Sequence, residues 1–159
     1  MKIKVAHFGV FTALAIILSY IETLIPINFG IPGVKLGLAN LVIVIALHKL
    51  SVTETLLISL SRIFLIGFLI GNMFSILYGL AGGFLSLFVM ALLIKLNKFS
   101  IIGISITGAV IHNIAQLVVA ILIVETLEIA YYLPVLLISG LITGLIIGYL
   151  SSRLLPLLQ

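Results

Sequence analysis

The chain has 159 residues and contains no cysteine, no tryptophan and no aspartate. Without cysteine it can form neither disulfides nor cysteine-based metal sites. Without aspartate it has no aspartate cluster that could hold magnesium and a diphosphate. It also lacks the G-x-x-x-x-G-K-[ST] motif of ATP hydrolysis and the H-E-x-x-H motif of zinc enzymes. These absences predict a chain that is not an enzyme and that has no catalytic residues, metal or cofactor.

Charge is scarce as well, and this decides the class of protein. Charged residues make up 8% of the chain, against about 25% in soluble domains, and 64% of the residues are hydrophobic. Such a chain cannot cover a water-facing surface, so we expect an integral membrane protein. The net charge of +4 comes from scattered single residues, which argues against a nucleic-acid partner. No polar linker interrupts the chain, so one domain over residues 1–159 is expected.

The apolar runs predict an all-α bundle of six transmembrane helices. A membrane-spanning helix needs about 20 apolar residues, and glycine, proline and asparagine mark the breaks between the runs. Lys2 and Lys4 precede the first run as in a signal peptide, but no cleavage site follows, so we expect a retained span. The six spans are Val5–Ile25, Val34–Leu50, Thr53–Ile70, Met73–Ile94, Ile101–Val124 and Tyr131–Leu150.

The lysines and arginines set the expected orientation, because cytoplasmic loops are enriched in them. With the N-terminus inside, both termini are cytoplasmic and only Lys35 falls outside, while Arg62 lies within a span. The basic residues then on the cytoplasmic side are Lys2, Lys4, Lys49, Lys95, Lys98 and Arg153. Ser51 and Glu54 have the spacing of a capping box, which predicts the start of the third span.

The second span is short, with only about 18 Å of helix between Leu36 and Leu47. Either this helix is short, or the proline- and glycine-rich loop 26–34 dips into the protein and completes the crossing. Irregular backbone at membrane depth must be buried in protein or line a cavity. The second alternative therefore implies a cavity open to the outside, with loop 26–34 as its lid.

Small residues recur at helical spacing and predict close helix packing. The sixth span carries Gly140, Gly144 and Gly148, and the ridge favours contacts inside the bundle over a docking face for another subunit. On the first span, the candidate docking residues for another membrane subunit are Gly9, Ala13, Ala15 and Ser19.

Arg62 is the most informative polar residue, because an ionisable group inside a span faces the protein interior and usually marks a site. A structural arginine paired to carbonyls or to a glutamate is the alternative. His112, Asn113 and Gln116 are three and four residues apart, so they can share one helix face. Buried amides and imidazoles need partners, so we expect these side chains to converge with Arg62.

A helix start near Lys35 would add a positive dipole end to the same region, which favours an anionic ligand. Each residue has a simpler alternative: Lys35 at the membrane interface, His112 as a hydrogen-bonded core residue, and Glu22 as a counter-ion of Arg62 or Lys35. The predicted substrate-binding residues are Lys35, Asn40, Arg62, Asn72, His112, Asn113 and Gln116.

Several stretches carry a resemblance to a known family. They are Pro32–Asn40, Arg62 with Gly71-Asn72, Ala81-Gly82-Gly83, and Gly108–Gln116 with its His-Asn-x-x-Gln core. The chain resembles the Gx transporter family, labelled heptaprenyl diphosphate synthase component I. That family looks related to the substrate-binding S-components of energy-coupling-factor transporters.

The resemblance implies a six-helix subunit of a prokaryotic plasma membrane that captures a small, anionic vitamin or metabolite from outside. Its partners would be membrane lipid, a transmembrane coupling subunit and two ATPase subunits. One alternative is a non-catalytic membrane partner of a polyprenyl (heptaprenyl) diphosphate synthase. Another is a facilitator that works alone.

Overall fold

The computed structural model describes residues 2–25 and 36–158, and every element in these ranges is helical. Five of the helices are long and apolar enough to cross a membrane, which is consistent with a multi-pass membrane protein. The predicted set of six helices is therefore confirmed, with one of them shorter than a span. The six are α1 (Lys2–Leu24), α2 (Leu38–Lys49), α3 (Val52–Leu69), α4 (Met73–Leu96), α5 (Ile101–Val124) and α6 (Leu133–Leu154).

The helices begin and end where local chemistry dictates. Ser51 and Glu54 form the predicted capping box at the start of α3. A second capping box, which the sequence analysis did not predict, joins Asn72 and Ser75 at the start of α4. Each box satisfies backbone N–H groups that a helix start leaves without partners. The tight turn between α3 and α4 is thus stabilised on its α4 side.

Two predicted spans need correction. The second was expected over 34–50, but residues 36 and 37 are not helical and α2 begins at Leu38. Gly37 has φ of 76°, a left-handed conformation that glycine adopts without strain. The sixth span was expected to begin at Tyr131. Helix α6 begins at Leu133 instead, because Pro134 lies in its first turn and suits a helix start, while the candidate membrane span runs from Leu127 to Leu158.

Between α5 and α6 the chain forms a short 3-10 helix, η1 (Leu127–Tyr132), and a second one, η2 (Leu155–Leu158), follows α6. Helix α2 is only twelve residues long, so it is too short to cross a membrane by itself. Loop 26–34, the expected lid, lies outside the described residues, as does Lys35.

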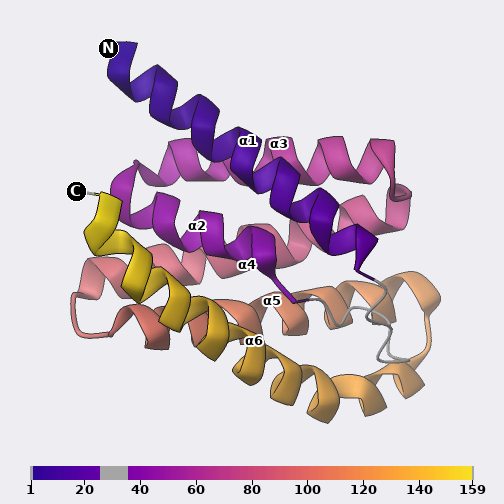
Figure 1. The fold of residues 1–159 in the computed structure, drawn as a ribbon. Helices are drawn as coiled ribbons and strands as arrows, with labels where there is room; N and C mark the ends of the chain where they lie inside the picture. Colours follow the sequence, from indigo (N-terminus) through magenta and orange to yellow (C-terminus); the bar gives the residue numbers. More distant parts are fainter. Residues whose placement is uncertain (1, 26–35, 159) are drawn as a thin grey trace.

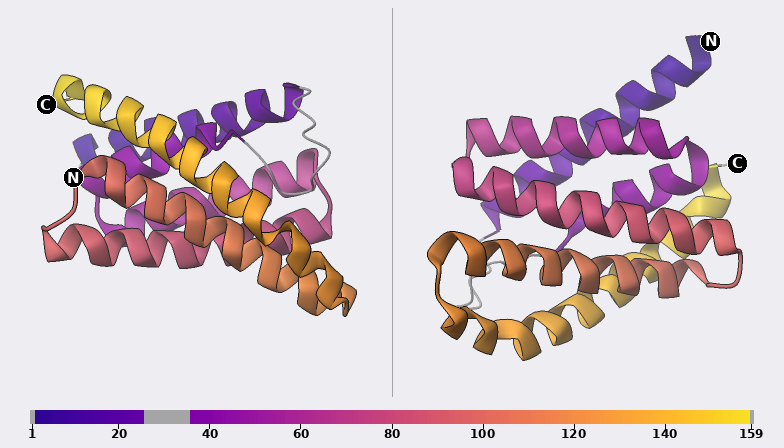
Figure 2. Two further views of the ribbon diagram at one scale, coloured as in Figure 1. Left: turned by 90° about the horizontal axis from the view of Figure 1, so that it is seen from below. Right: turned by 180° about the vertical axis from the view of Figure 1, so that it is seen from behind.

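The long helices contact one another in the order α1, α3, α4, α5 and α6. Figures 1 and 2 show α2 inside this arrangement, where it contacts α1, α3, α4 and α6. Every residue of α2 from Val42 to Leu47 is buried. A helix that is apolar all round suits this central position. However, α2 fills the centre over only part of the bundle's length (Figure 1).

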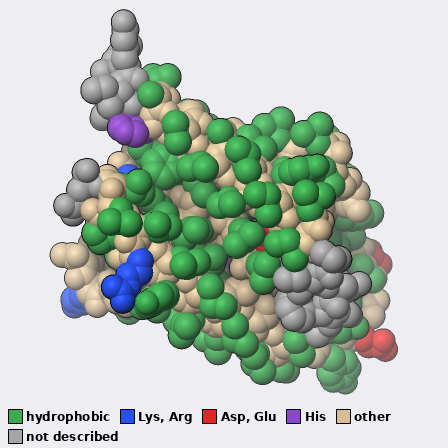
Figure 3. All heavy atoms as spheres, in the orientation of Figure 1, with side chains coloured by type: hydrophobic (Ala, Val, Ile, Leu, Met, Phe, Trp, Pro, Cys, Tyr) green, Lys and Arg blue, Asp and Glu red, His purple; other side chains and the backbone are tan. Residues whose placement is uncertain are grey.

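The bundle has two ends, which we name by their residues. The Gly71 end holds the α3–α4 turn, the end of α1 and η1, and the termini end holds the N- and C-termini (Figure 1). Lys49, Lys95 and Arg153 lie in the last turns of their helices at the termini end. Between the ends, the face in Figure 3 is largely apolar, as contact with lipid requires.

The glycine ridge of α6 packs inside the molecule. A Cβ atom on Gly144 would lie 2.6 Å from the Cα atom of Ile106, and one on Gly148 would lie 2.7 Å from that of Ile102. Both neighbours belong to the backbone of α5, which cannot give way as a side chain can. The ridge therefore serves contact between α5 and α6, the interpretation that the sequence favoured over a docking face.

The four candidate docking residues of α1 fall into two groups. Gly9 and Ala13 are exposed, and a Cβ atom on Gly9 would meet nothing within 4 Å. Ala15 and Ser19 are 0% and 7% exposed, so they are buried in this molecule and cannot form a docking surface. The prediction was wrong for this second pair because the two pairs lie on different faces of α1. Docking through Gly9 and Ala13 stays a prediction.

Candidate functional site: a polar chamber beyond the start of α2

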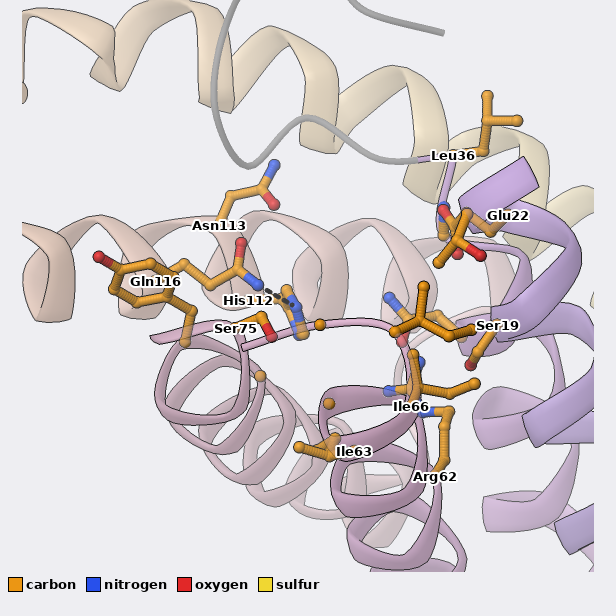
Figure 4. Close-up of a pocket in the computed structure, with 18 of the residues that line it drawn as sticks. Ser19, Glu22, Leu36, Arg62, Ile63, Ile66, Ser75, His112, Asn113 and Gln116 are labelled. Carbon is orange, nitrogen blue, oxygen red and sulfur yellow. Dashed lines mark hydrogen bonds between the residues drawn. The ribbon is translucent and has the colours of Figure 1, made fainter. Parts of the chain in front are cut away.

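A chamber of about 550 Å³ lies in the half of the bundle toward the Gly71 end (Figure 4). Its volume is within the range of about 300–1,000 Å³ typical of small-molecule sites. Residues of α1, α3, α4 and α5 form its walls, with Leu36, Gly37 and Asn40 at the start of α2. Among the described residues, α2 begins only at Leu38, so no described helix fills the centre of that half.

The chamber brings together six of the seven predicted substrate-binding residues. The seventh, Lys35, lies outside the described residues. Glu22, the predicted counter-ion, lines the chamber too. The six that line it are Asn40, Arg62, Asn72, His112, Asn113 and Gln116. The structure thus shows the convergence expected of these side chains, while their role in binding stays a prediction.

Arg62 enters the chamber from α3 (Figure 4). Its Nε atom is buried and has no hydrogen-bond partner among the described residues. Within these residues, no carbonyl and no carboxylate forms a direct bond with the guanidinium. The structural alternative, an arginine held by helix-end carbonyls or by a glutamate, therefore finds no support in the described part of the chain. Its hydrogen-bonding capacity remains available to a ligand.

Glu22 occupies the α1 side of the chamber. Its Oε1 atom accepts a hydrogen bond from the backbone N–H of Gly37, which links α1 to the residue that precedes α2. Glu22 and Arg62 act on each other electrostatically, but no direct ion pair joins them among the described residues. The predicted counter-ion is thus close to Arg62 without touching it. The direct hydrogen-bond partner of the Glu22 carboxylate is the backbone N–H of Gly37.

His112 and Gln116 share one face of α5, as their spacing predicts. The Gln116 amide nitrogen donates to Nε2 of His112 over 3.0 Å, so this ring nitrogen acts as an acceptor. The imidazole lies against Gly82 of α4, where a Cβ atom would lie 2.8 Å from the ring. Gly82 therefore makes room for His112. The Ala81-Gly82-Gly83 stretch carried part of the family resemblance, but its contact with the imidazole was not predicted.

Two of the predicted amides also have structural partners. The Asn113 amide nitrogen donates to the carbonyl of Leu136 over 2.8 Å and joins α5 to α6. The Asn72 side-chain oxygen accepts from the backbone N–H of Ser75 over 2.8 Å and caps α4. Each of these amides keeps only part of its hydrogen-bonding capacity for a ligand. Neither role was visible from the spacing of polar residues alone.

The sequence missed further residues of the chamber. Ser19 was assigned to docking but lines the chamber from α1, and Thr143 contributes from α6. Ser19 lies three residues before Glu22, so helical spacing could have placed both on one face. The apolar part of the wall includes Ile63, Ile66, Ile70 and Phe74, which come from α3 and the start of α4. The chamber thus combines a cationic and an anionic group with an apolar side.

The described residues contain no group of three histidine, cysteine or acidic side chains that could hold a metal ion. In comparisons with known proteins, a family model described as heptaprenyl diphosphate synthase component I matches residues 11–154. No curated protein and no solved structure matches the chain.

Proposed function

The chain belongs to the heptaprenyl diphosphate synthase component I family, and from this premise we propose that it is a substrate-binding membrane subunit. It captures a small molecule with an anionic group in the chamber and passes it to a membrane importer. The observation that carries this proposal is Arg62, a half-buried cation that lines a chamber of ligand size and has an unpartnered Nε. A charged group at membrane depth marks a functional site by default.

In this proposal the Gly71 end faces the outside of a prokaryotic plasma membrane, as the positions of the lysines and arginines favour. A ligand from outside then reaches the chamber without crossing the buried half of the bundle around α2. Arg62 binds the anionic group, and His112, Gln116 and Asn40 orient the rest of the ligand. A transmembrane coupling subunit and two ATPase subunits supply the energy, because the chain has no ATP-hydrolysis motif of its own.

The test begins with gentle extraction of the protein and identification of the bound ligand by native mass spectrometry. The affinity of this ligand is then measured for the unchanged protein and for Arg62→Gln. Loss of one partner of a buried charge pair should weaken binding by about thirtyfold to several thousandfold. Arg153→Gln is the matched control, since Arg153 lies in the last turn of α6 at the termini end. Unchanged affinity in Arg62→Gln would remove the guanidinium from the site and overturn the proposal.

The family description favours a second candidate, a non-catalytic membrane partner of a polyprenyl diphosphate synthase. The absence of aspartate is consistent with a chain that leaves the diphosphate chemistry to another subunit. Purification of the complex from its native membrane separates the two candidates. A soluble prenyl synthase among the co-purifying proteins supports the partner function, whereas ATPase subunits with a coupling protein support uptake.

A further inference from the structure

The described wall of the chamber carries one cation and one carboxylate, and they are not joined to each other. Arg62 enters from α3 and Glu22 from α1 (Figure 4). The two groups interact electrostatically without a direct ion pair among the described residues. A buried charge needs a partner of opposite sign or hydrogen bonds, and Arg62 and Glu22 do not supply this to each other directly. Their separation therefore points to a ligand.

Each of the two charged side chains keeps a hydrogen-bonding atom that could bind that ligand. The Nε atom of Arg62 is buried and has no hydrogen-bond partner in the described part of the chain. Glu22 uses Oε1 to accept from the Gly37 N–H, and Oε2 bonds to no other described residue. The guanidinium can still donate to an anionic group, and the carboxylate can still accept from a cationic one.

The balance of charge points the same way. Arg62 and Glu22 carry opposite charges in the described lining. A monoanion on Arg62 would leave Glu22 in this lining without a partner of opposite charge. A zwitterion adds no net charge to the chamber and gives both Arg62 and Glu22 a partner of opposite charge.

The apolar side of the chamber favours a ligand whose remaining part is apolar. Ile63, Ile66, Ile70 and Phe74 line it beside Arg62, on α3 and at the start of α4. Burial of an apolar group against these side chains would add binding free energy that needs no further polar partner.

We infer that the ligand of the chamber is a small zwitterion with an apolar body, of the α-amino-acid type. Its carboxylate binds Arg62, its ammonium group binds Glu22, and its apolar part faces the α3–α4 side. This inference rests on the proposed function and narrows its ligand class. It also gives Glu22 a binding role in addition to its hydrogen bond with Gly37.

Two sets of matched compounds test it. In the first set, phenylalanine carries both charges, 3-phenylpropanoate only the negative one and 2-phenylethylamine only the positive one. In the second set, leucine, 4-methylpentanoate and 3-methylbutylamine carry the same three combinations in the same order. Their affinities for the purified full chain are measured by calorimetry. The amino acid of at least one set should bind about tenfold or more tightly than its matched acid and amine.

Glu22→Gln supplies the decisive variant, since its amide oxygen can still accept from the Gly37 N–H and the contact between α1 and α2 is kept. The preference for the amino acid over the matched acid should then disappear. Glu128→Gln, which changes an exposed carboxylate in η1 outside the chamber, should leave the preference unchanged.

Three results would overturn the inference: the acid binding as tightly as the amino acid, a preference that survives Glu22→Gln, or no binding of either amino acid. In the first two cases, binding that still depends on Arg62 would leave the proposed function standing. In the third, that function is judged separately, by whether the mass retained in the native protein is lost in Arg62→Gln.

Discussion

Gly82 and His112 show how a single residue shapes the chamber. The imidazole occupies the space that a side chain on Gly82 would need, because a Cβ atom there would lie 2.8 Å from the ring. The contact holds His112 in place between α4 and its partner Gln116 on α5. A glycine on α4 thereby decides where a polar group of α5 lies.

Gly82→Ala should destabilise the protein by about 1–3 kcal/mol, because the added methyl group displaces the ring. The measurement is the free energy of unfolding by denaturant in mild detergent. In the double variant Gly82→Ala/His112→Ala, most of this cost should vanish, since the clashing ring is gone. Additive costs in the double variant would show that the two residues do not interact in this way.

Two amides of the chamber have a structural role beside the binding role proposed for them. Asn113 ties α5 to the Leu136 carbonyl of α6, and Asn72 caps α4. Loss of ligand binding in a variant of either residue would therefore mix a structural with a binding effect. Arg62 is the cleaner probe, because it makes no hydrogen bond within the described residues.

At the scale of elements, the two small-residue helices behave differently. The ridge of α6 meets the backbone of α5 at Gly144 and Gly148, whereas Gly9 on α1 faces open space. The same pattern of small residues thus serves internal packing in one helix and leaves an unpartnered face in the other. Only contacts distinguish the two cases.

This contrast predicts opposite effects of one substitution. Gly144→Ala should destabilise the protein by about 1–3 kcal/mol, since its Cβ atom would press on the Cα atom of Ile106. Gly9→Ala should stabilise it by up to about 1 kcal/mol, because alanine favours a helix and meets nothing there. Thermal and denaturant unfolding in the same detergent measure both. Equal effects of the two substitutions would contradict this account of α5–α6 packing.

The short α2 is the element that makes the chamber possible. Its twelve residues span about 18 Å, and its buried run from Val42 to Leu47 fills the other half of the bundle. The backbone N–H of Gly37, just before this helix, is held by Glu22. The length and the start of α2 therefore affect both the size of the chamber and the position of the Gly37 N–H at its wall.

At the scale of the whole molecule, the long helices surround a chamber that lies toward the Gly71 end. The proposed function requires this Gly71 end to face outside. Substituted cysteines can test the orientation, because the chain has no cysteine of its own. Glu128 lies in η1 at the Gly71 end, and Lys98 lies in the connection between α4 and α5 at the termini end.

Glu128→Cys should react with a membrane-impermeant maleimide on intact cells, and Lys98→Cys should react only after the membrane is opened. Labelling is read as a mass shift of the purified protein. The reverse pattern would place the chamber on the cytoplasmic side and exclude capture from outside. Reaction of both positions in opened membranes is the control for accessibility of each thiol.

The class of protein, the six helices, the capping box of α3 and the inward-facing polar residues could all be predicted from the sequence. These follow from composition, apolar run length and local spacing, which are properties of the chain near each residue. The sequence analysis misplaced the starts of α2 and α6 by a few residues, and it put Ala15 and Ser19 on a docking surface.

Which groups meet followed from the three-dimensional packing of the helices. Gly82 lies against His112, Glu22 accepts from the Gly37 N–H, and Thr143 of α6 joins the chamber wall. Helical spacing shows which residues share a face, but not which neighbour that face meets. The neighbour depends on how the helices cross and on where α2 begins, and these are set by packing across the whole bundle.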